Sequence, residues 1–522
     1  MQIVEISKVQ VRSTLKVNDT RTGKPGVAPA LAWSQGLKVE VGGAGSVAHA
    51  GIVLPRLVAD RVGLTSGLSA ALARAGFSPG RDRGRALSDA VSCLAAGASC
   101  LSDVEAMTSQ VEIFGPAGGA SDSTMLRVLD EFAERLNDHE LPARRLAKVL
   151  ASARATAWAH IVARHGQLPA VKVAGGDLRR AGTVAGGSCG GGRPVVVVRL
   201  DATLIEAHSA KDGCAGHFKG GFGYHPLTAW CSNVGDNLAV MLRPGNAGSF
   251  TASDHLLVLD AALAQLPAPW RTDVLVTIDG AGASREVITH LSKLNTAPVH
   301  GGRGRRIEYS IGWPTDERTM AGIGQLPESA WVEALGADGK VERQAHVADL
   351  TGILRQGPDG DRMAGWPPDQ RVVVRRTRRP AGKPAKLGEH PDWEYGAFTT
   401  NTATGQIQWL DARHRTQAHV EDKMKELKAC GAEGLPSKSW ARNSAWLQLA
   451  ALACSVNAWL RHIALDGDLA KAEPKALRYR LFGAPARLVV HARQTILKVP
   501  PGWAWAHDVA DAFTRIHALH PA

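Results

Sequence analysis

The sequence lacks the patterns of a disulfide-rich, zinc-binding or membrane-spanning protein. Its seven cysteines are odd in number and widely spread, with no Cys-x-x-Cys and no Cys/His spacing of the zinc-finger kind, so we expect reduced thiols. The N-terminal stretch has no apolar signal-peptide core. The most apolar helical stretch, residues 444–462, contains Gln448, Ser455 and Asn457, and it falls short of the roughly 20 apolar residues that a membrane span needs. We therefore expect a buried helix there, no membrane partner and a cytoplasmic protein.

Acidic residues are the minority charge. The 522 residues include 61 Lys and Arg but 49 Asp and Glu, which gives a formal net charge of +12. Such an excess favours a polyanionic partner, with nucleic acid ahead of an anionic membrane surface. A chain of this length also exceeds one ordinary core, so the sequence predicts about two to four domains.

The first third of the chain has a mainly helical pattern. Apolar residues recur at i, i+3, i+4 and i+7 between residues 54 and 165. Residues 121–136 begin with an N-cap-like Ser-Asp-Ser-Thr cluster. They fit a bundle helix better than the recognition helix of a helix-turn-helix, because no three-residue turn stands out. The Gly-rich run 182–194 precedes a strand, the wrong order for a phosphate-binding loop, so we interpret it as a linker.

After this run the pattern alternates between strands and helices. Three strand-like runs, a helix, a fourth strand and another helix lie between residues 195 and 294, which indicates a mixed α/β fold. Residues 300–410 contain strand-like pieces among Pro- and Gly-rich loops and are typical of an inserted β-rich module. Helical patterns return at 413–431 and 440–465.

Two acidic residues stand at the ends of apolar strands. The run "PVVVVRLDA" leads to Asp201 and "DVLVTIDG" to Asp279, where Gly280 and Gly282 leave room for a ligand beside the backbone. A strand-end turn residue is the plain alternative for either acid alone. Since central strands of one sheet can bring such ends together, the pair predicts a functional site.

A third acid comes from the helix predicted at 413–431. Its buried stripe is spaced at i, i+4 and i+7 from Val420. Glu421 lies about 100° round from the start of that stripe, whereas Asp422 lies about 200° round and faces solvent, so Glu421 is the acid that can reach the sheet. Four basic or polar residues share its face and are expected to contact DNA: His414, Gln417, Lys425 and Lys428. A solvated helix with Glu–Lys pairs is the alternative.

Three carboxylates suit phosphodiester chemistry. Two Mg²⁺ ions about 3.5–4 Å apart activate the attacking oxygen and shield the leaving oxygen, and Mg²⁺ prefers hard oxygen ligands. Asp201, Asp279 and Glu421 therefore predict a site for two Mg²⁺ ions, for which Mn²⁺ can substitute. His or Cys clusters are not needed for such a site, which agrees with their absence from the sequence.

The order of strands, helices and acids resembles the ribonuclease-H-like fold of DDE transposases. More narrowly, "DATLIEAHSAKDGCAGHFKGGFGYHPLTAW", "DVLVTIDGAGAS" and "HVEDKMKELKACGAEGLPSKSWARNSAWLQLAALA" resemble bacterial transposases of the insertion-sequence thirteen-eighty family, which is related to the IS-four-like cut-and-paste transposases. The resemblance implies Asp201, Asp279 and Glu421 as the catalytic and metal-binding residues. It also implies a β-rich insertion between the second and third acids.

The resemblance implies an α/β protein with six regions. These are a mostly helical N-terminal region for DNA binding and dimerisation, a Gly-rich linker, the first part of a ribonuclease-H-like core, the β-rich insertion, the second part of the core with the glutamate helix, and a basic, helical C-terminal region. Their expected bounds are, in the same order, 1–180, 181–194, 195–300, 301–410, 411–470 and 471–522.

One part of the family pattern is absent. The relatives have Tyr, two residues, Arg, three residues, Glu, six residues and Lys, whereas this chain has His414 and Gln417 in place of the tyrosine and the arginine. Glu421 and Lys428 match the pattern. The phosphate contacts of the missing arginine would fall to neighbouring basic residues: Arg413, Arg415 or Lys425.

Basic residues recur in two further stretches. Residues 371–387 contain seven basic residues and no acid, and the five arginines are expected to bind the DNA end: Arg371, Arg375, Arg376, Arg378 and Arg379, followed by Lys383 and Lys386. The alternative is an edge strand whose charged side chains prevent aggregation. We expect this module outside the catalytic sheet, where three tryptophans could stack on unpaired bases or be buried: Trp313, Trp366 and Trp393. The C-terminal basic residues form either a phosphate-binding track or a solvated face: Arg478, Arg480, Arg487, Arg493 and Lys498.

The sequence as a whole predicts a DNA transposase. We expect it to bind double-stranded DNA, both the terminal inverted repeats of its element and target DNA, as a homodimer at the nucleoid in a bacterial cytoplasm. It would cut the repeats with Mg²⁺ and join the 3′ ends to target DNA. A ribonuclease-H-like DNA nuclease without strand transfer and a catalytically inactive, transposase-derived DNA-binding protein are the alternatives.

Overall fold

The chain forms two compact units, Met1–Ala44 and Gly45–Ala522. The computed structural model describes residues 40–180, 192–248, 251–296, 304–356, 361–380, 382, 385 and 390–521. The fold below is therefore that of the second unit, in which the N-terminal helices, the strands and the C-terminal elements share one hydrophobic core.

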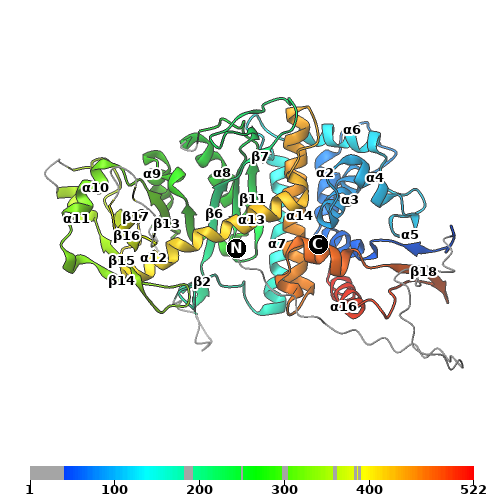
Figure 1. Cartoon of the computed structure of the whole chain (residues 1–522). Coiled ribbons are helices and arrows are strands. Elements are labelled where there is room, and N and C mark those ends of the chain that lie inside the picture. The colour runs from blue at the N-terminus through cyan, green and yellow to red at the C-terminus, as the bar shows by residue number, and fades with distance from the viewer. Residues whose placement is uncertain are drawn as a thin grey trace, which may run out of the picture. The chain divides into compact units, whose positions relative to one another are not determined.

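A nine-stranded mixed sheet organises this unit (Figure 1). β12 (Asp273–Ile278) is parallel to both of its neighbours, β6 (Val196–Ala202) and β13 (Arg306–Trp313), and the other pairings are antiparallel. The spatial order is β11-β10-β6-β12-β13-β17-β16-β15-β14. The remaining strands are β10 (Leu227–Cys231), β11 (Asp236–Met241), β14 (Val332–Leu335), β15 (Val341–Asp349), β16 (Arg371–Arg378) and β17 (Trp393–Thr400).

The strands of the expected insertion extend this sheet. β17 pairs with β13 on one side, where Trp313 stands opposite Ala397, and with β16 on the other. β16, which carries the basic run, lies inside the sheet between β17 and β15. The prediction that this module lies outside the catalytic sheet is therefore wrong, and so is the alternative of a charged edge strand. Short helices accompany these strands: α10 (Glu317–Gly324) and α11 (Thr351–Gln356).

The valine run of β6 is continuous because both faces of this central strand are covered. Val196 and Val198 join the main core, to which α8 (Ala252–Gln265) and α9 (Arg285–Leu294) contribute. Val197 packs on the opposite face in a cluster that includes α12 (Ile407–Arg415). The yellow segment in Figure 1, from α12 to α13 (Val420–Leu427), runs along this second face. The expected order of three antiparallel strands, helix, strand and helix is observed as β6, β10, β11, α8, β12 and α9.

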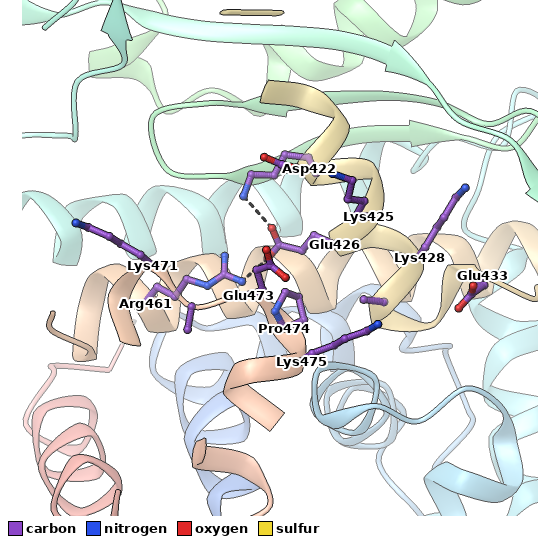
Figure 2. A pocket seen from close by; sticks show the side chains of 13 residues that line it. Asp422, Lys425, Glu426, Lys428, Glu433, Arg461, Lys471, Glu473, Pro474 and Lys475 are labelled. Carbon is purple, nitrogen blue, oxygen red and sulfur yellow. Dashed lines mark hydrogen bonds and ion pairs between the residues drawn. The ribbon is translucent and has the colours of Figure 1, made fainter. Parts of the chain in front are cut away.

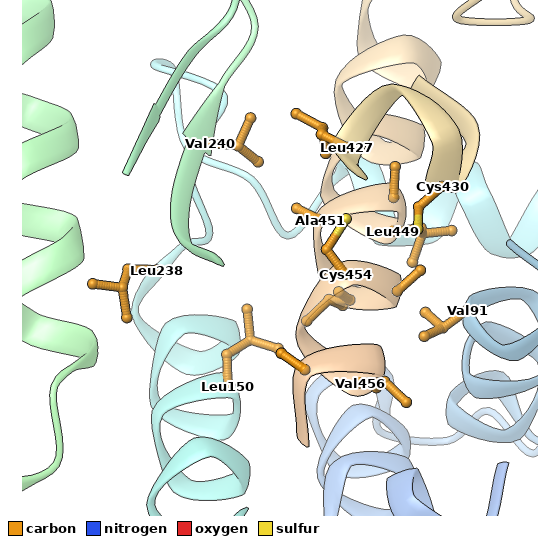
Figure 3. Packing of buried hydrophobic residues seen from close by; sticks show 14 of the residues in the cluster. Val91, Leu150, Leu238, Val240, Leu427, Cys430, Leu449, Ala451, Cys454 and Val456 are labelled. Atoms are coloured by element: carbon orange, nitrogen blue, oxygen red, sulfur yellow. The ribbon is translucent and has the colours of Figure 1, made fainter. Parts of the chain in front are cut away.

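The longest helix, α14 (Trp440–Ala464), is buried along most of its length. Figure 3 shows Val91 of α3 and Leu150 of α7 on the two sides of this helix, and Val240 of β11 in the same cluster. The expectation of a buried helix at 444–462 is confirmed. In the described part of the chain no single helix is long and apolar enough to cross a membrane, and only α3 and α4, bent by 99° at the break between them, meet that length and composition test as a pair.

Polar residues of α14 complete the hydrogen bonds of β11, which is an edge strand of the sheet. Gln448 Nε2 donates to the Val240 carbonyl at 2.7 Å, and Ser455 Oγ accepts from the Asn237 N–H at 3.2 Å. The helix therefore both covers and satisfies an edge that would otherwise expose unpaired backbone groups.

A buried carboxylate joins this edge to two helices. Asp236 Oδ2 accepts from Arg154 Nε of α7 at 2.9 Å, from Trp158 Nε1 at 3.1 Å and from Trp459 Nε1 of α14 at 3.0 Å. Such a fully partnered charge holds α7, β11 and α14 in one arrangement.

The N-terminal helices form a bundle beside α14. α6 begins at the N-cap Ser121, whose side chain accepts from the Thr124 N–H, and it buries Met125, Val128 and Phe132. The bundle-helix interpretation of 121–136 agrees with this packing. The helices are α1 (Val53–Arg61), α2 (Leu64–Leu72), α3 (Arg83–Ala96), α4 (Leu101–Thr108), α5 (Val111–Phe114), α6 (Asp122–Ala133) and α7 (Arg144–His165).

The C-terminal region is not all helical, which corrects the expectation for 471–522. A hairpin of β18 (Ala486–His491) and β19 (Gln494–Lys498) pairs with β1 (Ser46–Val47). It lies between α15 (Pro474–Leu477) and α16 (Ala506–His517). Of the expected linker 181–194, residues 181–191 lie outside the described residues, and Arg193–Pro194 pair with Arg179–Arg180.

Candidate active site

Asp201 and Asp279 stand at the same end of two neighbouring parallel strands. β6 and β12 run side by side with Leu200 opposite Ile278, and each acid is the next residue along its chain. Since parallel strands end at the same edge of a sheet, the two carboxylates lie at one edge. The expected strand-end positions are therefore observed.

The side chains of both acids are on the sheet face that the α12–α13 segment covers. Arg199, two residues before Asp201, donates from Nη2 to Thr416 Oγ1 at 2.8 Å, just after α12. Thr277 stands in the same relation to Asp279, and its hydroxyl is 3.2 Å from Arg199 Nη1. Because side chains two residues apart along a strand share a face, the two acids project toward the helical segment.

Helix α13 brings Glu421 to this edge. Four residues earlier, Gln417 donates from Nε2 at 2.9 Å to the carbonyl of the residue before Asp201. Three residues later, the sulfur of Met424 lies 3.6 Å from Thr228 Oγ1, and that hydroxyl donates to the Asp201 carbonyl at 3.0 Å. Residues three and four apart lie on one side of a helix, so these two anchors place Glu421 beside the strand that ends in Asp201.

The three acids influence one another electrostatically. The pKa of Asp201 is raised to about 7, first by burial and then by the negative charges of Asp279 and Glu421. The Ala202 N–H donates to Asp201 Oδ1 at 2.8 Å and acts in the opposite direction. Bringing a cation between these carboxylates would relieve their repulsion and favour their charged forms.

The donor set suits a hard divalent cation that keeps part of its hydration. Among the described residues, no three His, Cys, Asp or Glu groups are gathered closely enough to hold a metal ion by themselves. Mg²⁺ retains several waters and binds through one or two carboxylates together with substrate phosphates. The loosely spaced carboxylates of Asp201, Asp279 and Glu421 fit that requirement better than they fit a closed structural metal site.

Glycines shape the turn that carries Asp279. A Cβ on Gly312 of β13 would lie 2.5 Å from the Gly280 nitrogen and 3.0 Å from the Asp279 carbonyl carbon, so only glycine lets the turn rest against β13. Around Gly280 a Cβ would meet nothing within 4 Å, which is the open side expected for a ligand, whereas one on Gly282 would meet Ile278. Of the two glycines after Asp279, the first therefore borders open space and the second serves packing.

Two histidines that we did not single out in the sequence lie within the electrostatic influence of Asp279. Burial lowers the pKa of both His225 and His255, and the charge of Asp279 opposes this shift in each case. His225 directly precedes the loop into β10, whose first residue pairs with Ala202 beside the first acid. Because β10 runs antiparallel to β6, the chain is back at the acid end of the sheet just before β10 begins. The predicted antiparallel pair could therefore have placed His225 at that end from the sequence.

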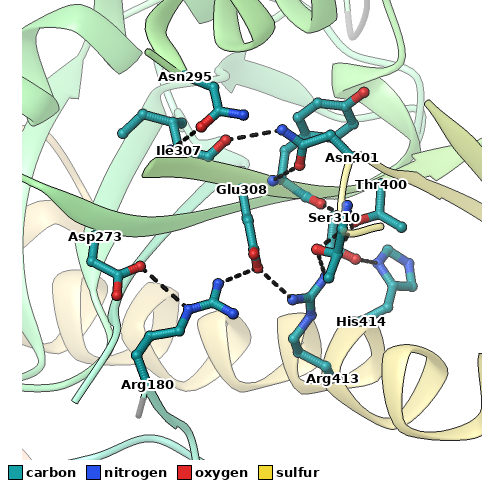
Figure 4. Close-up of polar contacts among 12 residues, drawn as sticks. Arg180, Asp273, Asn295, Ile307, Glu308, Ser310, Thr400, Asn401, Arg413 and His414 are labelled. Carbon is teal, nitrogen blue, oxygen red and sulfur yellow. Dashed lines mark hydrogen bonds and ion pairs between the residues drawn. The ribbon is translucent and has the colours of Figure 1, made fainter. Parts of the chain in front are cut away.

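The expectation that His414 and Gln417 contact DNA is corrected by their positions. The His414 ring stacks on Phe398 with centroids 4.5 Å apart, its Nδ1 lies 3.0 Å from Ser310 Oγ, and burial together with nearby arginines lowers its pKa to about 3 (Figure 4). Gln417 is 8% exposed and hydrogen-bonds Thr277. Both side chains attach the helical segment to the sheet.

Arg413 is also committed to the interior. Its Nη1 lies 3.0 Å from Glu308 Oε2, and Glu308 in turn pairs with Arg180, which reaches Asp273 at 3.4 Å (Figure 4). Arg415 pairs with Asp411 at 3.2 Å. Neither arginine is placed to take over the phosphate contacts of the missing family arginine.

Cations at the end of α13 and directly after it remain at the surface. Lys425 is exposed and pairs with Asp422 at 2.9 Å, and Asp422 faces solvent as expected. Lys428 lines a pocket of about 510 Å³ together with Lys471 and Lys475 (Figure 2). The pocket is therefore rich in lysine, although its floor contains the buried Glu426 held by Lys423 and Arg461.

Of the five arginines at 371–379, four pair with acids of this chain: three in β16, and Arg379 directly after it. Arg371 binds Asp349 at 2.9 Å, Arg375 binds Asp411 at 2.7 Å, Arg376 binds Glu328, and Arg379 binds Glu394 at 3.1 Å. Arg378 is exposed and has no ion pair within the described ranges. Carboxylates of this chain therefore neutralise most of the positive charge of this basic run. Lys383 and Lys386 lie outside the described residues.

The three tryptophans of this region pack against protein groups. Trp313 is buried in a cluster that Trp366 joins from the side, with ring centroids 5.0 Å apart. Trp393 and Trp331 sandwich the Arg376 guanidinium at 4.5 and 4.4 Å. Their use as stacking surfaces for bases is not supported by these positions.

The C-terminal basic residues have different surroundings. Arg478 donates to backbone carbonyls of Ala95 and Ala429, and the Arg480 guanidinium lies 5.6 Å from the Trp505 ring. The other three occupy the exposed hairpin: Arg487, Arg493 and Lys498. Only the hairpin is open to a phosphate-binding role.

Comparisons with known proteins bear on the same region. The sequence model of a family described as "Transposase DDE domain group 1" matches residues 192–521. Among solved structures, the chain is similar to one titled "Cryo-EM structure of piggyBac transposase synaptic complex with hairpin DNA", with 9% identity and a TM-score of 0.38, covering 84% of this chain and 82% of that chain. No curated protein matches.

Proposed function

This chain belongs to the transposase DDE domain family, group 1, and we propose that it cuts the terminal inverted repeats of a mobile element and joins the 3′ ends to target DNA. The observation that carries the proposal is the arrangement of three acids at one sheet edge. Asp201 and Asp279 end paired strands, and the charge of Glu421 reaches Asp201 from α13.

A ribonuclease-H-like core is the fold that this proposal requires. The order β6, β10, β11, α8, β12, α9, with β12 parallel to β6, supports it. The quoted motifs around Asp201, Asp279 and Glu421 further support membership of the bacterial insertion-sequence thirteen-eighty group, which would place the protein at the nucleoid in the cytoplasm.

Divalent metal ions are part of the proposed chemistry. Two Mg²⁺ ions, for which Mn²⁺ can substitute, would be held by Asp201, Asp279 and Glu421, and would supply nucleophile activation and leaving-group stabilisation. Metal binding requires charged carboxylates. Since the pKa of Asp201 is about 7, this chain's own acids favour metal binding increasingly as the pH rises through neutrality.

DNA contacts would surround this edge. Lys425 and Lys428 extend from the glutamate helix beyond the sheet, and Arg378 offers a further exposed cation on β16. Double-stranded inverted repeats and target DNA are the proposed partners. A homodimer on DNA is proposed as well, because two element ends must be held for joining.

The test is a cleavage map. Duplexes made from the DNA that flanks the gene for this chain are labelled at each 5′ end and incubated with the protein and Mg²⁺, beside a duplex of shuffled sequence. Cuts at the repeat boundary followed by joined products in a supercoiled target plasmid support the proposal. Cutting without joined products would identify a ribonuclease-H-like nuclease, and binding without cutting an inactive DNA-binding protein.

A further inference from the structure

Two exposed phenylalanines occupy the tip of a small sheet next to the acids. The sheet consists of β7 (Ile205–Glu206), β9 (Phe222–Tyr224) and β8 (Ala215–Gly216). Phe218 is 73% exposed and Phe222 is 42% exposed. Large apolar side chains that are exposed together at one place often mark a binding surface.

The tip lies at the acid end of the large sheet. β7 begins four residues after Asp201, and the chain returns to this end because β10 starts opposite Ala202. The Phe218 ring centroid lies 6.0 Å from that of His225, two residues before the Leu227 that pairs with Ala202 beside Asp201. Phe218 is thus an exposed aromatic residue beside the proposed site of DNA cleavage.

The tip is held in one conformation. His217 Nε2 lies 2.9 Å from Glu206 Oε1, and the His217 N–H donates to the Gly221 carbonyl at 3.0 Å. The Gly220 N–H donates back to the His217 carbonyl at 2.9 Å. A Cβ on Gly221 would lie 2.4 Å from His217 Nε2, so a larger residue there would displace the His217 ring from this arrangement. Phe218 is therefore presented outward on a fixed turn, which limits the entropy lost on binding.

We propose that Phe218 stacks on an unpaired DNA base beside the cleaved phosphodiester, while Lys219 contacts the adjacent phosphate. The inference rests on the proposed function for its DNA substrate. Every base offers a flat face to an aromatic ring, and Lys219 Nζ lies 5.7 Å from the Phe218 ring centroid, so the flexible lysine side chain provides a cation within reach of the phosphate of a stacked nucleotide. The neighbouring lysine favours a nucleic acid over an apolar protein partner.

The experiment compares affinity for single-stranded and duplex DNA without Mg²⁺. The probes are an oligodeoxythymidine of about 15 nucleotides and a blunt duplex of equal length. Phe218→Ala should weaken single-strand binding about 5- to 150-fold, the range that follows from the known strength of base stacking, and duplex binding much less. Phe218→Trp should retain single-strand binding. Phe77→Ala is the matched control, because Phe77 is 51% exposed and has a guanidinium 5.7 Å from its ring.

A direct contact is read by cross-linking. Oligodeoxythymidine with one 5-iododeoxyuridine should cross-link under ultraviolet light to the tryptic peptide that contains Phe218. Unchanged single-strand affinity in Phe218→Ala, or an equal loss in Phe77→Ala, overturns the proposal. Loss of self-association with DNA binding intact would instead assign Phe218 to a contact between copies. Because neither assay needs cleavage, a protein that cuts no DNA but cross-links at Phe218 disproves the proposed function alone.

Discussion

The two halves of the nine-stranded sheet use charge in opposite ways. At the end of β6 and β12, like charges accumulate, and the pKa of Asp201 rises to about 7 in consequence of burial and of its acidic neighbours. In the half formed by β14 to β17, opposite charges are matched, since three arginines of β16 and Arg379 directly after it each bind a carboxylate. The sheet is continuous through both halves.

This difference distinguishes charged residues that could bind a ligand from charged residues that stabilise the fold. A charged side chain that already has a partner in the protein stabilises the fold and attracts a ligand only weakly. Charges of one sign that are held together, in contrast, attract an external counterion. The basic run at 371–379 is conspicuous in the sequence, but most of its arginines form ion pairs with acids of this chain. The acids at the ends of β6 and β12 instead gather charge of one sign at one edge of the sheet.

The largest expected effect concerns the acids. Asp279→Asn or Glu421→Gln should lower the rate of DNA cleavage by at least about 10³-fold, because a group needed for the reaction itself is lost, while end binding stays within a few-fold. Initial rates on labelled repeat duplexes and gel-shift affinities measure the two quantities. Asp422→Asn is the control on the same turn, since Asp422 is exposed and paired with Lys425. Substantial cutting by Glu421→Gln would move the assignment to Asp422 or Glu426.

The second prediction tests whether the arginines are structural. Arg375→Gln removes the cation 2.7 Å from the Asp411 carboxylate, whose side chain is 2% exposed. We expect a decrease of about 2–4 kcal/mol in the free energy of unfolding, because a buried charge loses a partner. Denaturant titration measures this change. Arg378→Gln on the same strand should alter stability by less than about 0.5 kcal/mol, and equal effects of the two variants would contradict the distinction.

The third prediction uses the raised pKa of Asp201. A carboxyl group whose pKa is higher in the folded than in the unfolded protein binds more protons when folded, so stability falls as the pH rises from about 4 to about 7 and the penalty is full above 7. Without divalent metal, Asp201→Asn should therefore stabilise the protein by about 1–3 kcal/mol at pH 8, and little at pH 4. Mg²⁺ should raise the melting temperature of the unchanged protein at pH 8 but not that of the variant.

The smallest expected effect concerns exposed cations near DNA. Arg378→Gln and Lys428→Gln should each reduce the slope of log affinity against log salt by about 0.9, the value for one phosphate contact on duplex DNA. Fluorescence anisotropy over a salt series gives the slope. Lys340→Gln is the control, because Lys340 is 87% exposed on a turn between β14 and β15. An unchanged slope for Arg378→Gln would leave β16 with a purely structural role.

The acid-bearing strands and their order could be predicted from the sequence because they depend on local pattern. The run from Val195 to Leu200 is apolar on both faces of the strand, and an acid directly after such a run falls at the strand end whatever surrounds it. The period of the glutamate helix also predicts Glu421 toward the sheet and Asp422 toward solvent; both residues are exposed in the structure, and the charge of Glu421 acts on Asp201. Their roles in catalysis remain predictions.

The depth of the residues on that helix could not be predicted from its period. His414, Gln417, Glu421 and Lys428 share one side of the segment, as expected, but the segment runs along the sheet toward its edge. The first two residues therefore lie over the interior, whereas Glu421 is exposed and Lys428 lines a pocket. A helical wheel gives direction around the axis and not position along the partner surface.

By itself the sequence determined which segments form strands and helices and where the acids fall along them, because hydrophobic periodicity and strand ends are properties of neighbouring residues. Only the tertiary structure decided that the inserted strands join the sheet that carries Asp201 and Asp279, and that four of the arginines at 371–379 are neutralised. Their partners, Glu328, Asp349, Glu394 and Asp411, are 15 to 48 residues away along the chain. No local pattern contains such pairings, because electrostatic partners are selected by distance in space.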